Sequence, residues 1–307
     1  MSGGICYNIK ALIESLTQRG IDCKTNVSAN ELSLLKCGGY AKVVAYPKTI
    51  PEITETLWAT KDYAIPFYVL GNGSNTLILD GGFNGLVISL KNFRHLFIRE
   101  NRVVVSAGTK MPTLSRKLAL LGYEGLEKLS GIPCSIGGAT IKNAGCYGVD
   151  FSSLVQKVFC LNTKTLKKEI IPKSNILYTY RSSNDSFLNR IVLYVALELK
   201  KSDADLIKII NDYGIKRKAS QPSAHSLGSV FLRCDDGISA GYYIEKAGLK
   251  GITQGGAMIS PKHANFIVNL GNATASDYIS LVELCEHVVK NKFNVTLKRE
   301  IDITGDN

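Results

Sequence analysis

Two glycine-rich loops are the segments of this sequence whose residue types and spacing could do chemistry. The first, residues 71–75, reads GNGSN and directly follows a predicted strand at 66–70. Two glycines separated by one residue permit positive φ, so successive backbone N–H groups can point at a phosphate. The loop lacks the Rossmann pattern, because Thr76 stands where a third glycine would fall and β-type residues follow it. Taken alone, it could equally be a plain hairpin turn.

The second loop, residues 131–148, contains five glycines in 18 residues. We expect this density to prevent a regular element and to suit a backbone lying flat against a planar or polyphosphate ligand. The apolar residues between the glycines argue against a merely flexible loop. Two such loops, about 60 residues apart in the chain, predict an extended dinucleotide held at two places.

Three polar residues stand isolated in apolar surroundings: Arg181 in YRSS, Ser229 in GSVF and Glu300 in a predicted strand. They form no self-evident triad, because no histidine is placed to activate the serine, and each alone favours a structural role. The eight cysteines are scattered without a C-x-x-C pair and the chain has four histidines, so we expect no structural metal and mostly reduced, partly buried thiols. The residues alone thus predict a dinucleotide-binding protein with a separate C-terminal domain.

Helices and strands alternate irregularly around these loops, which predicts an α+β protein with three compact parts. A charged, turn-rich stretch at 216–226 is predicted to connect two of them. Helices are expected at 8–20, 50–62, 112–121, 203–213, 240–247 and 275–291. Strands are expected at 42–46, 66–70, 77–79, 86–90, 95–98, 103–105, 155–161, 166–171, 191–199, 265–270 and 295–303.

Composition narrows the class of protein. The 307 residues are 45% hydrophobic and 21% charged, which excludes disorder and low complexity. No apolar run approaches the roughly 18 residues of a membrane helix, and residues 1–10 lack a secretion signal, so a cytoplasmic location is expected. The net charge of +11 is dispersed and not interleaved with aromatics. It therefore favours phosphate-bearing small ligands, or a merely solvated surface, over nucleic acid.

Eight ordered segments carry a resemblance to a known family. They are CGGYA (37–41), LGNGSNTLILDGGFNG (70–85), GLEKLSGIPCSIGGATIKNAGCYG (125–148), YRSS (180–183), GSVF (228–231), AGLKG (247–251), HANFIVN (263–269) and KFNVTLKREIDITG (292–305). Over about residues 34–305 the chain resembles the UDP-N-acetylenolpyruvoylglucosamine reductases. The arginine after GSVF and the short last part resemble the compact type of that family.

The resemblance implies a two-part FAD-binding region of the vanillyl-alcohol-oxidase type, residues 1–92 and 93–202, and a C-terminal α+β substrate-binding domain, residues 203–307. It implies an oxidoreductase with non-covalent FAD, reduced by NADPH as co-substrate. The substrate would be UDP-N-acetylglucosamine enolpyruvate and the product UDP-N-acetylmuramate, for peptidoglycan synthesis, cell wall biogenesis, cell shape and cell division. No nucleic acid partner and no membrane insertion are expected, and the oligomeric state stays open.

The resemblance also assigns residues. Arg181 and Glu300 would stabilise the enolate formed when hydride reaches the enolpyruvyl group, and Ser229 would donate the proton. An enolate is a strong base, so a serine needs no activating histidine. Substrate binding would involve Tyr180, Arg217 or its neighbour Lys218, Arg233 and His263. Cofactor binding would involve Gly71, Asn72, Gly73, Ser74, Asn75, Ser135, Ile136, Gly137, Gly138, Asn143, Ala144 and Gly145.

Some positions depart from the family pattern. Cys134 replaces a usual glycine, Lys142 a usual methionine, and Cys234 with Asp235 the proline after the GSVF turn. Two rival hypotheses remain: another FAD oxidase of the same fold, with flavin tethered to Cys134 or Cys146, and a non-catalytic flavin- or nucleotide-binding protein. The presence of Arg181, Ser229 and Glu300 together argues against the second.

Overall fold

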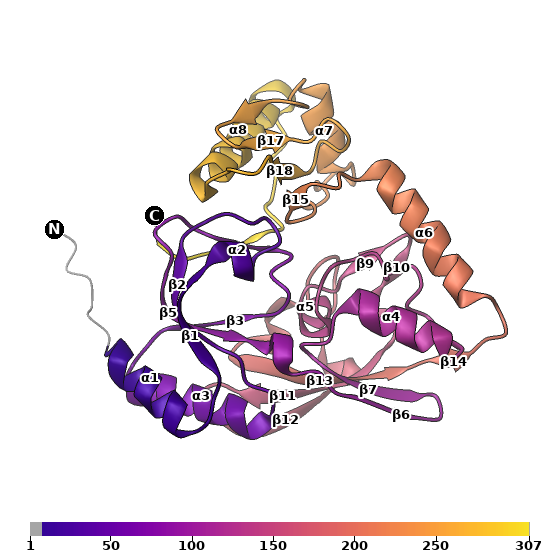
Figure 1. The fold of residues 1–307 in the computed structure, drawn as a ribbon. Helices are drawn as coiled ribbons and strands as arrows, with labels where there is room; N and C mark the ends of the chain where they lie inside the picture. Colours follow the sequence, from indigo (N-terminus) through magenta and orange to yellow (C-terminus); the bar gives the residue numbers. More distant parts are fainter. Residues whose placement is uncertain (1–7, 307) are drawn as a thin grey trace. The chain divides into compact units, whose positions relative to one another are not determined.

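The computed structural model describes residues 8–306 and divides into two compact units. Unit 1 takes the described residues up to Asn26, then Lys42–Asn72 and Gly85–Gly214, and unit 2 takes Val27–Ala41, Gly73–Asn84 and the residues from Ile215 onward. Figure 1 colours these segments along the chain. Residues 1–7, which include Cys6 and most of the stretch predicted to carry no secretion signal, lie outside the described residues. The three-part division at 92/93 and 202/203 stays a prediction.

Unit 1 is built on two sheets. A four-stranded sheet, mainly in this unit, has the order β1-β2-β5-β3, and a five-stranded sheet has the order β12-β11-β13-β7-β6. Two-stranded pairs β14-β8 and β10-β9 complete it. The strands are β1 (Cys23–Ser28), β2 (Tyr40–Ala45), β3 (Phe67–Leu70), β5 (Phe83–Ser89), β6 (Leu96–Arg99), β7 (Arg102–Ser106), β8 (Tyr123–Glu124), β9 (Gly145–Cys146), β10 (Val149–Asp150), β11 (Val155–Asn162), β12 (Lys168–Pro172), β13 (Arg190–Glu198) and β14 (Lys200–Lys201).

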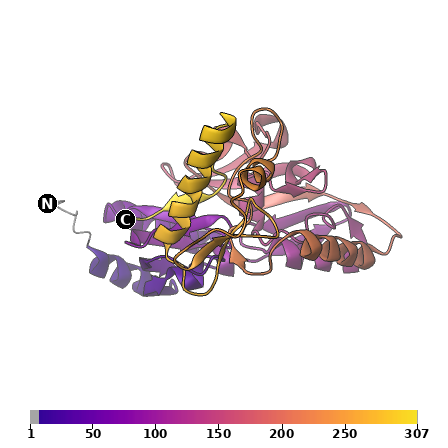
Figure 2. The ribbon, with the colours of Figure 1, turned by 90° about the horizontal axis from the view of Figure 1, so that it is seen from above.

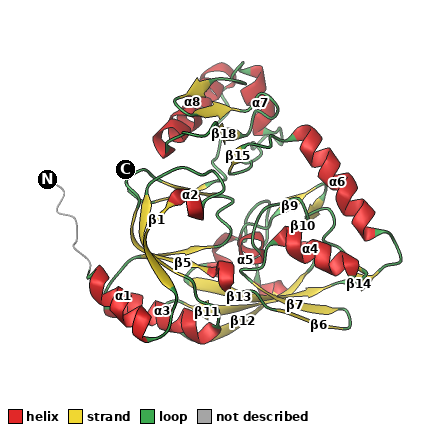
Figure 3. Ribbon diagram, in the orientation of Figure 1, coloured by secondary structure: helices red, strands yellow, loops and turns green. Residues whose placement is uncertain are grey.

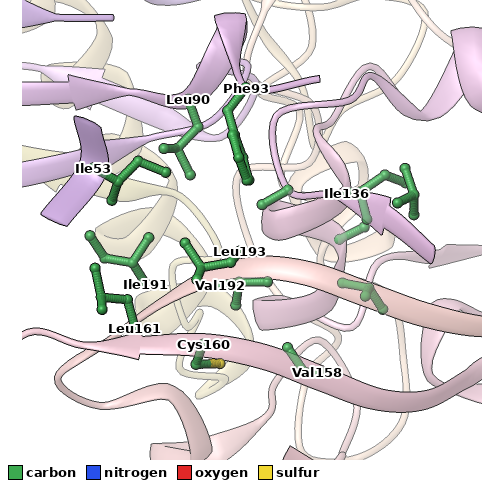
Figure 4. Close-up of a cluster of buried hydrophobic side chains, with 14 of the residues drawn as sticks. Ile53, Leu90, Phe93, Ile136, Val158, Cys160, Leu161, Ile191, Val192 and Leu193 are labelled. Carbon is green, nitrogen blue, oxygen red and sulfur yellow. The ribbon is translucent and has the colours of Figure 1, made fainter. Parts of the chain in front are cut away.

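Helices cover these sheets and enclose one hydrophobic core. The helix α5 packs against β13 and β7, as Figure 3 shows. Figure 4 shows side chains of this core beside the strands β11 and β13, among them the fully buried Ile53, Phe93 and Ile136. The helices are α1 (Ile9–Gln18), α3 (Ile50–Asp62), α4 (Met111–Leu120), α5 (Ile136–Ile141) and α6 (Leu206–Ser220), which runs from unit 1 into unit 2, with short 3₁₀ turns at Leu90–Asn92, Phe151–Ser153, Lys173–Asn175 and Asn184–Phe187.

Unit 2 has its own core around the longest helix, α8 (Ala275–Phe293). Figure 2 shows α8 as one continuous helix. The sheet order is β15-β18-β17-β16, and β19 pairs in parallel with β4. The remaining elements are α2 (Ala29–Leu32), α7 (Ala240–Lys246), β4 (Thr76–Ile78), β15 (His225–Ser226), β16 (Thr253–Gln254), β17 (Ala257–Ile259), β18 (Ile267–Asn269) and β19 (Asp302–Thr304).

This mixture of helices and strands confirms the α+β class, and strongly periodic elements were predicted best. The helix predicted at 50–62 is α3, which begins where the Thr49 hydroxyl accepts the backbone N–H of Glu52 at 3.3 Å. Proline in its first turn is compatible with a helix start. The predicted helices at 8–20, 112–121, 240–247 and 275–291 are also present within a few residues.

Three predictions were wrong in detail. The glycine-dense loop does hold a regular element, α5, because Ser135 caps it by accepting from the Gly138 N–H at 3.2 Å. The connection predicted at 216–226 begins later, since α6 continues to Ser220, where basic residues in the last turn favour a helix end. In the strand predicted at 295–303 only β19 is a strand, and Ile303 is 37% exposed rather than buried. Residues 298–300 instead bond to the short turn 230–232.

The described cysteines form no disulfide, and five of the seven are buried. Burial raises the pKa of Cys37, Cys160 and Cys285 to about 12 each. Within residues 8–306 no group of His, Cys, Asp or Glu side chains could hold a metal ion. None of the helices in that range combines the length and apolarity that crossing a membrane requires.

The capping box of α8 yields a stability prediction. Asp277 accepts backbone N–H groups of Thr274 at 3.0 Å and Gly256 at 3.2 Å, and these bonds lower its pKa. Replacing Asp277 by Ala should cost about 1 kcal/mol of the free energy of unfolding at neutral pH. Because the folded pKa is depressed, this contribution is complete above the ordinary aspartate pKa of about 4 and is lost as the pH falls through the lowered value.

Urea denaturation of wild type and Asp277→Ala over a pH series measures this difference. The control is Asp212→Ala, which removes an exposed partner of Lys208 on α6 and should change stability little. A stability gap that stays constant after the carboxyl is fully protonated would contradict the assignment.

Candidate active site

The start of the first glycine loop, residues 71 and 72, lies beside the second glycine loop within unit 1, whereas residues 73–75 belong to unit 2. A Cβ atom at Gly71 would collide with the Ser135 hydroxyl, and the Asn72 side chain donates to the Pro133 carbonyl at 2.6 Å. Segments about 60 residues apart in sequence are thus in direct contact. This arrangement agrees with one extended ligand contacting both loops.

The loop at 71–75 also presents unsatisfied backbone donors. Among the described residues, none accepts a hydrogen bond from the backbone N–H groups of residues 71–75. These donors are available to a ligand, and a phosphate supplies several acceptors. Gly73 has φ of +61°, and a Cβ there would collide with the Leu32 carbonyl oxygen, so this loop shape requires glycine.

Two adjacent glycines of the second loop, Gly137 and Gly138, have different surroundings. Gly137 faces inward, because its N–H bonds to the Ala107 carbonyl at 2.9 Å and a Cβ would lie 2.8 Å from the Ala107 Cβ. Gly138 faces open space, since the only atom near a Cβ there would be the Ser135 hydroxyl oxygen at 3.4 Å. Gly138 therefore leaves the backbone of α5 accessible, whereas Gly137 serves internal packing.

Arg181, one of the three isolated polar residues, has a side chain that is 17% exposed. Its guanidinium donates to the carbonyls of Asn143 at 3.2 Å and of Gly145, and it pairs with Asp150 at 3.1 Å. The YRSS turn is thereby held on the second glycine loop. Two segments that the sequence analysis singled out separately form one structure in unit 1.

Asn143 contributes to this structure with its side chain. Its amide nitrogen donates to the Thr179 carbonyl at 2.9 Å, and its amide oxygen accepts from the Ser152 N–H at 3.0 Å. It is buried, with φ of +43°, in the left-handed region that asparagine tolerates. Both side-chain groups are thus used within the protein, and Asn143 fixes the turn that carries Arg181.

Ser229 lies in unit 2 on an irregular turn held by a buried asparagine. Asn265 accepts the Phe231 N–H at 3.0 Å and donates to the Phe231 carbonyl at 2.8 Å, and its own carbonyl accepts the Val230 N–H at 2.9 Å. Gly228, with φ of +80°, begins the turn. Ser229 is half-buried, and no described residue hydrogen-bonds to its hydroxyl, so the structure provides it with no activating base.

Glu300 is tied to the same turn and to the first glycine loop. Its backbone N–H donates to the Val230 carbonyl at 2.8 Å, and its own carbonyl accepts from the Asn75 side chain at 3.0 Å. The Asp302 N–H in turn donates to the Asn75 carbonyl at 2.8 Å. The backbones at Ser229 and Glu300 are therefore fixed relative to each other within unit 2, whereas Arg181 belongs to unit 1.

The predicted substrate-side residues are more dispersed. Tyr180 is 49% exposed and stacks under the Arg181 guanidinium, 4.9 Å from ring centroid to Cζ. Arg217 is in the last turn of α6, and Arg233 is exposed beyond the GSVF turn. Burial lowers the pKa of His263, whose Nδ1 accepts the Asn265 N–H at 3.2 Å. His263 thus supports the asparagine that holds the Ser229 turn.

The sequence analysis missed Asn265 and the structural role of Asn75. Asn265 stands in the run HANFIVN and is 7% exposed. An asparagine inside an apolar run has to be hydrogen-bonded if it is buried, and that signal could have identified it. No sequence pattern could have revealed the structural role of Asn75, because its hydrogen-bond partner Glu300 lies 225 residues away in the chain.

Two departures from the family pattern are accommodated without disruption. Cys134 is 8% exposed, and its carbonyl accepts the Met111 N–H at 2.9 Å ahead of α5. Cys146 is not a departure but the second candidate for a flavin tether, and its thiol donates to the Lys128 carbonyl at 2.9 Å. Cys234 is buried, and its N–H donates to the Ile238 carbonyl at 2.9 Å, closing a tight loop after the GSVF turn.

Comparison with known proteins decides the family. Residues 41–163 match the model of an FAD binding domain, and residues 221–304 match the UDP-N-acetylenolpyruvoylglucosamine reductase, C-terminal domain. The chain is 39% identical over 280 residues to the UDP-N-acetylenolpyruvoylglucosamine reductase of Geobacillus kaustophilus, covering 89% of this chain and 90% of that one. With the Lactobacillus acidophilus enzyme it shares 37% over 293 residues, covering 95% and 98%. The chain belongs to the UDP-N-acetylenolpyruvoylglucosamine reductase family.

A solved reductase from Thermus caldophilus has the same fold. It is 31% identical, its match covers 92% of this chain and 98% of the other, and the TM-score is 0.76. Together with the FAD binding domain match, this similarity confirms the predicted fold class and an FAD-dependent oxidoreductase. The two glycine loops fit FAD, because the N–H groups at 71–75 are available to phosphate oxygens and Gly138 leaves the neighbouring backbone open.

Gly138 gives a direct test of this fit. A Cβ at Gly138 makes only an ordinary contact with the Ser135 hydroxyl oxygen, 3.4 Å away, so a valine side chain should occupy the open side of α5 and exclude FAD. We expect Gly138→Val to purify without flavin colour and to melt at a lower temperature, because it lacks the stabilisation by bound ligand.

The matched control is Gly214→Val in α6, where a Cβ meets nothing within 4 Å. This variant should retain flavin. Flavin content from the visible spectrum and the melting temperature are measured for both. Full FAD occupancy in Gly138→Val would show that this face of α5 does not contact the cofactor.

Proposed function

We propose that Arg181, Ser229 and Glu300 carry out the family's reaction in this chain: reduction of the enolpyruvyl group of UDP-N-acetylglucosamine enolpyruvate to UDP-N-acetylmuramate, a step in peptidoglycan precursor synthesis. FAD, bound without a covalent bond and reduced by NADPH, supplies the hydride. The observation that supports this assignment best is the tie between Ser229 and Glu300. Adjacent to Ser229, the Val230 carbonyl accepts the Glu300 N–H.

Addition of hydride to the enolpyruvyl double bond leaves negative charge that delocalises as an enolate into the substrate carboxylate. Preorganised donors stabilise such charge more than water does, because they need no reorganisation during the reaction. Arg181 supplies a fixed cation, held by the carbonyls of Asn143 and Gly145. Its low exposure strengthens this effect, because screening by solvent is reduced.

Ser229 would complete the reaction by donating its hydroxyl proton to the enolate carbon. No described residue hydrogen-bonds to this hydroxyl, so it is not committed to an internal acceptor. A serine is a weak acid in water, but an enolate carbon is basic enough to take its proton. Glu300 assists the anion only when it is protonated or acts through a hydrogen bond, because a bare carboxylate would repel the enolate.

The remaining predicted site residues complete the proposal. The cofactor contacts are residues 71–75, 135–138 and 143–145, and the sugar nucleotide contacts are Tyr180, Arg217, Arg233 and His263. FAD, NADPH and the UDP sugar are all polyanions, which gives the net charge of +11 a use. We also propose the cytoplasm as the location and the divisions 1–92, 93–202 and 203–307 as functional domains.

Ser229→Ala separates the two half-reactions. It removes the proposed proton donor but leaves NADPH and its hydride transfer untouched, so reduction of the flavin by NADPH should keep nearly the normal rate. Reoxidation by the enolpyruvyl substrate should slow by roughly 10²–10⁴-fold, as expected for loss of a positioned general acid. This corresponds to about 3–5 kcal/mol of transition-state stabilisation. Ser229→Cys should recover part of the rate.

Stopped-flow absorbance of the flavin measures each half-reaction separately. Ser280→Ala, an exposed hydroxyl on α8 that bonds to the Ser276 carbonyl, is the control and should leave both rates unchanged. Equal slowing of both halves in Ser229→Ala would mean that Ser229 is structural. An unchanged reoxidation rate would remove it from the mechanism.

A further inference from the structure

A tight hairpin fixes the position of Asp150 in unit 1. The strands β9 and β10 pair with Val149 opposite Cys146 and Asp150 opposite Gly145. The connecting residues Tyr147 and Gly148 both have positive φ, +51° and +78°, as in the two-residue turns that suit hairpins. A turn of this length sets the register, so Asp150 lies directly opposite Gly145.

The missing side chain of Gly145 makes room for an ion pair. A Cβ at Gly145 would collide with the Asp150 carboxylate and would lie 2.8 Å from Arg181 Nη1. Asp150 Oδ1 instead contacts Arg181 Nη1 at 3.1 Å. The carboxylate and the carbonyls of Asn143 and Gly145 thus approach the two terminal nitrogens of one guanidinium, which fixes its plane as well as its position.

The backbone of Arg181 adds a second constraint. Arg181 is the second residue of the tight turn between the bridged Thr179 and Ser182, and its φ is +54°. Residues other than glycine and asparagine rarely adopt this conformation, and they keep it only where the surroundings enforce it. The hydrogen bonds of the guanidinium and the contact of Asn143 with Thr179 provide that enforcement.

Stability alone does not account for this ion pair. The Asp150 side chain is 50% exposed, and ion pairs at such exposure contribute little to folding. A half-exposed carboxylate on a mostly buried guanidinium is better suited to hold its orientation and to balance its charge.

We propose that Asp150 is a positioning residue for Arg181. This inference rests on the proposed function, in which Arg181 stabilises the enolate. Asp150 touches no reacting atom. It keeps the guanidinium in a single orientation, so that loss of the carboxylate misplaces the cation without removing it. A small misplacement of a catalytic group can cost up to about 100-fold in rate.

The primary test compares Asp150→Asn with wild-type holoenzyme. Asparagine keeps the shape and one hydrogen-bond acceptor but loses the charge. We expect reoxidation of the flavin by the enolpyruvyl sugar nucleotide to slow about 10- to 100-fold, while reduction by NADPH keeps its rate. The control is Glu169→Gln, which removes the charge of another ion pair in the same unit. In that pair Arg190 Nε lies 2.6 Å from Glu169 Oε2, and each side chain is about 30% exposed. Glu169→Gln should leave both half-reactions unchanged.

A double-mutant cycle with Arg181→Lys shows whether Asp150 acts through Arg181. Asp150→Asn should cost little further rate in the Arg181→Lys background. If Arg181→Lys is slow but Asp150→Asn is as fast as wild type, or if the two effects multiply in full, the inference about Asp150 is overturned and the proposed function stands. If Arg181→Lys itself keeps the normal reoxidation rate, the proposed role of Arg181 fails, and the inference fails with it.

Two further readouts do not depend on the catalytic rate of Asp150→Asn. Because the carboxylate is half-exposed, formate should reach the space left in Asp150→Ala and restore part of the reoxidation rate, but it should not accelerate Arg181→Lys. In protein labelled with ¹⁵N-arginine, the Arg181 guanidinium should rotate slowly in wild type and faster in Asp150→Asn. Absence of rescue together with unchanged guanidinium rotation would contradict a positioning role, even if a variant folds poorly.

Discussion

The candidate site depends on one physical constraint: backbone groups of irregular segments need hydrogen-bond partners that no helix or sheet ladder supplies. Asparagine side chains meet this need, because an amide both donates and accepts in the same way as a peptide group. Each proposed catalytic residue lies within two positions of a backbone group held in this way. The pairs are Asn143 with Thr179 beside Arg181, Asn265 with Phe231 beside Ser229, and Asn75 with the carbonyl of Glu300 itself.

This construction places reactive side chains on turns without leaving the turns mobile. A residue in a strand can present its side chain only at the pleat spacing. A turn can direct a side chain more freely, but fixing the turn in one conformation costs conformational entropy. The hydrogen bonds of the asparagine side-chain amides offset that cost, and glycines leave room for the neighbouring groups to approach closely. Gly145 is the clearest example, because its missing side chain leaves the space in which Asp150 meets Arg181.

Sequence reasoning succeeded where local periodicity decided the outcome and failed where distant partners did. The helix α3 was predicted with its observed bounds, because apolar spacing and a proline near its start act locally. The short helix α5 was missed because glycine composition outweighed the capping serine, and residues 298–300 were taken for a strand because their partners at 230–232 lie far away in the chain. The glycine loops and the three isolated polar residues were found from composition alone. Their roles came from the family resemblance, because ordinary triad chemistry predicts nothing for them.

If this chain is a flavoenzyme whose two half-reactions use the same bound FAD, the visible spectrum of the purified protein should show it. We predict the absorption bands of oxidised flavin, released intact on acid precipitation because the attachment is not covalent. NADPH should bleach these bands, and the enolpyruvyl sugar nucleotide should restore them in the absence of oxygen. A colourless protein that does not take up added FAD, or a reduced flavin that the sugar nucleotide fails to reoxidise, would show that the chain does not carry out this reaction.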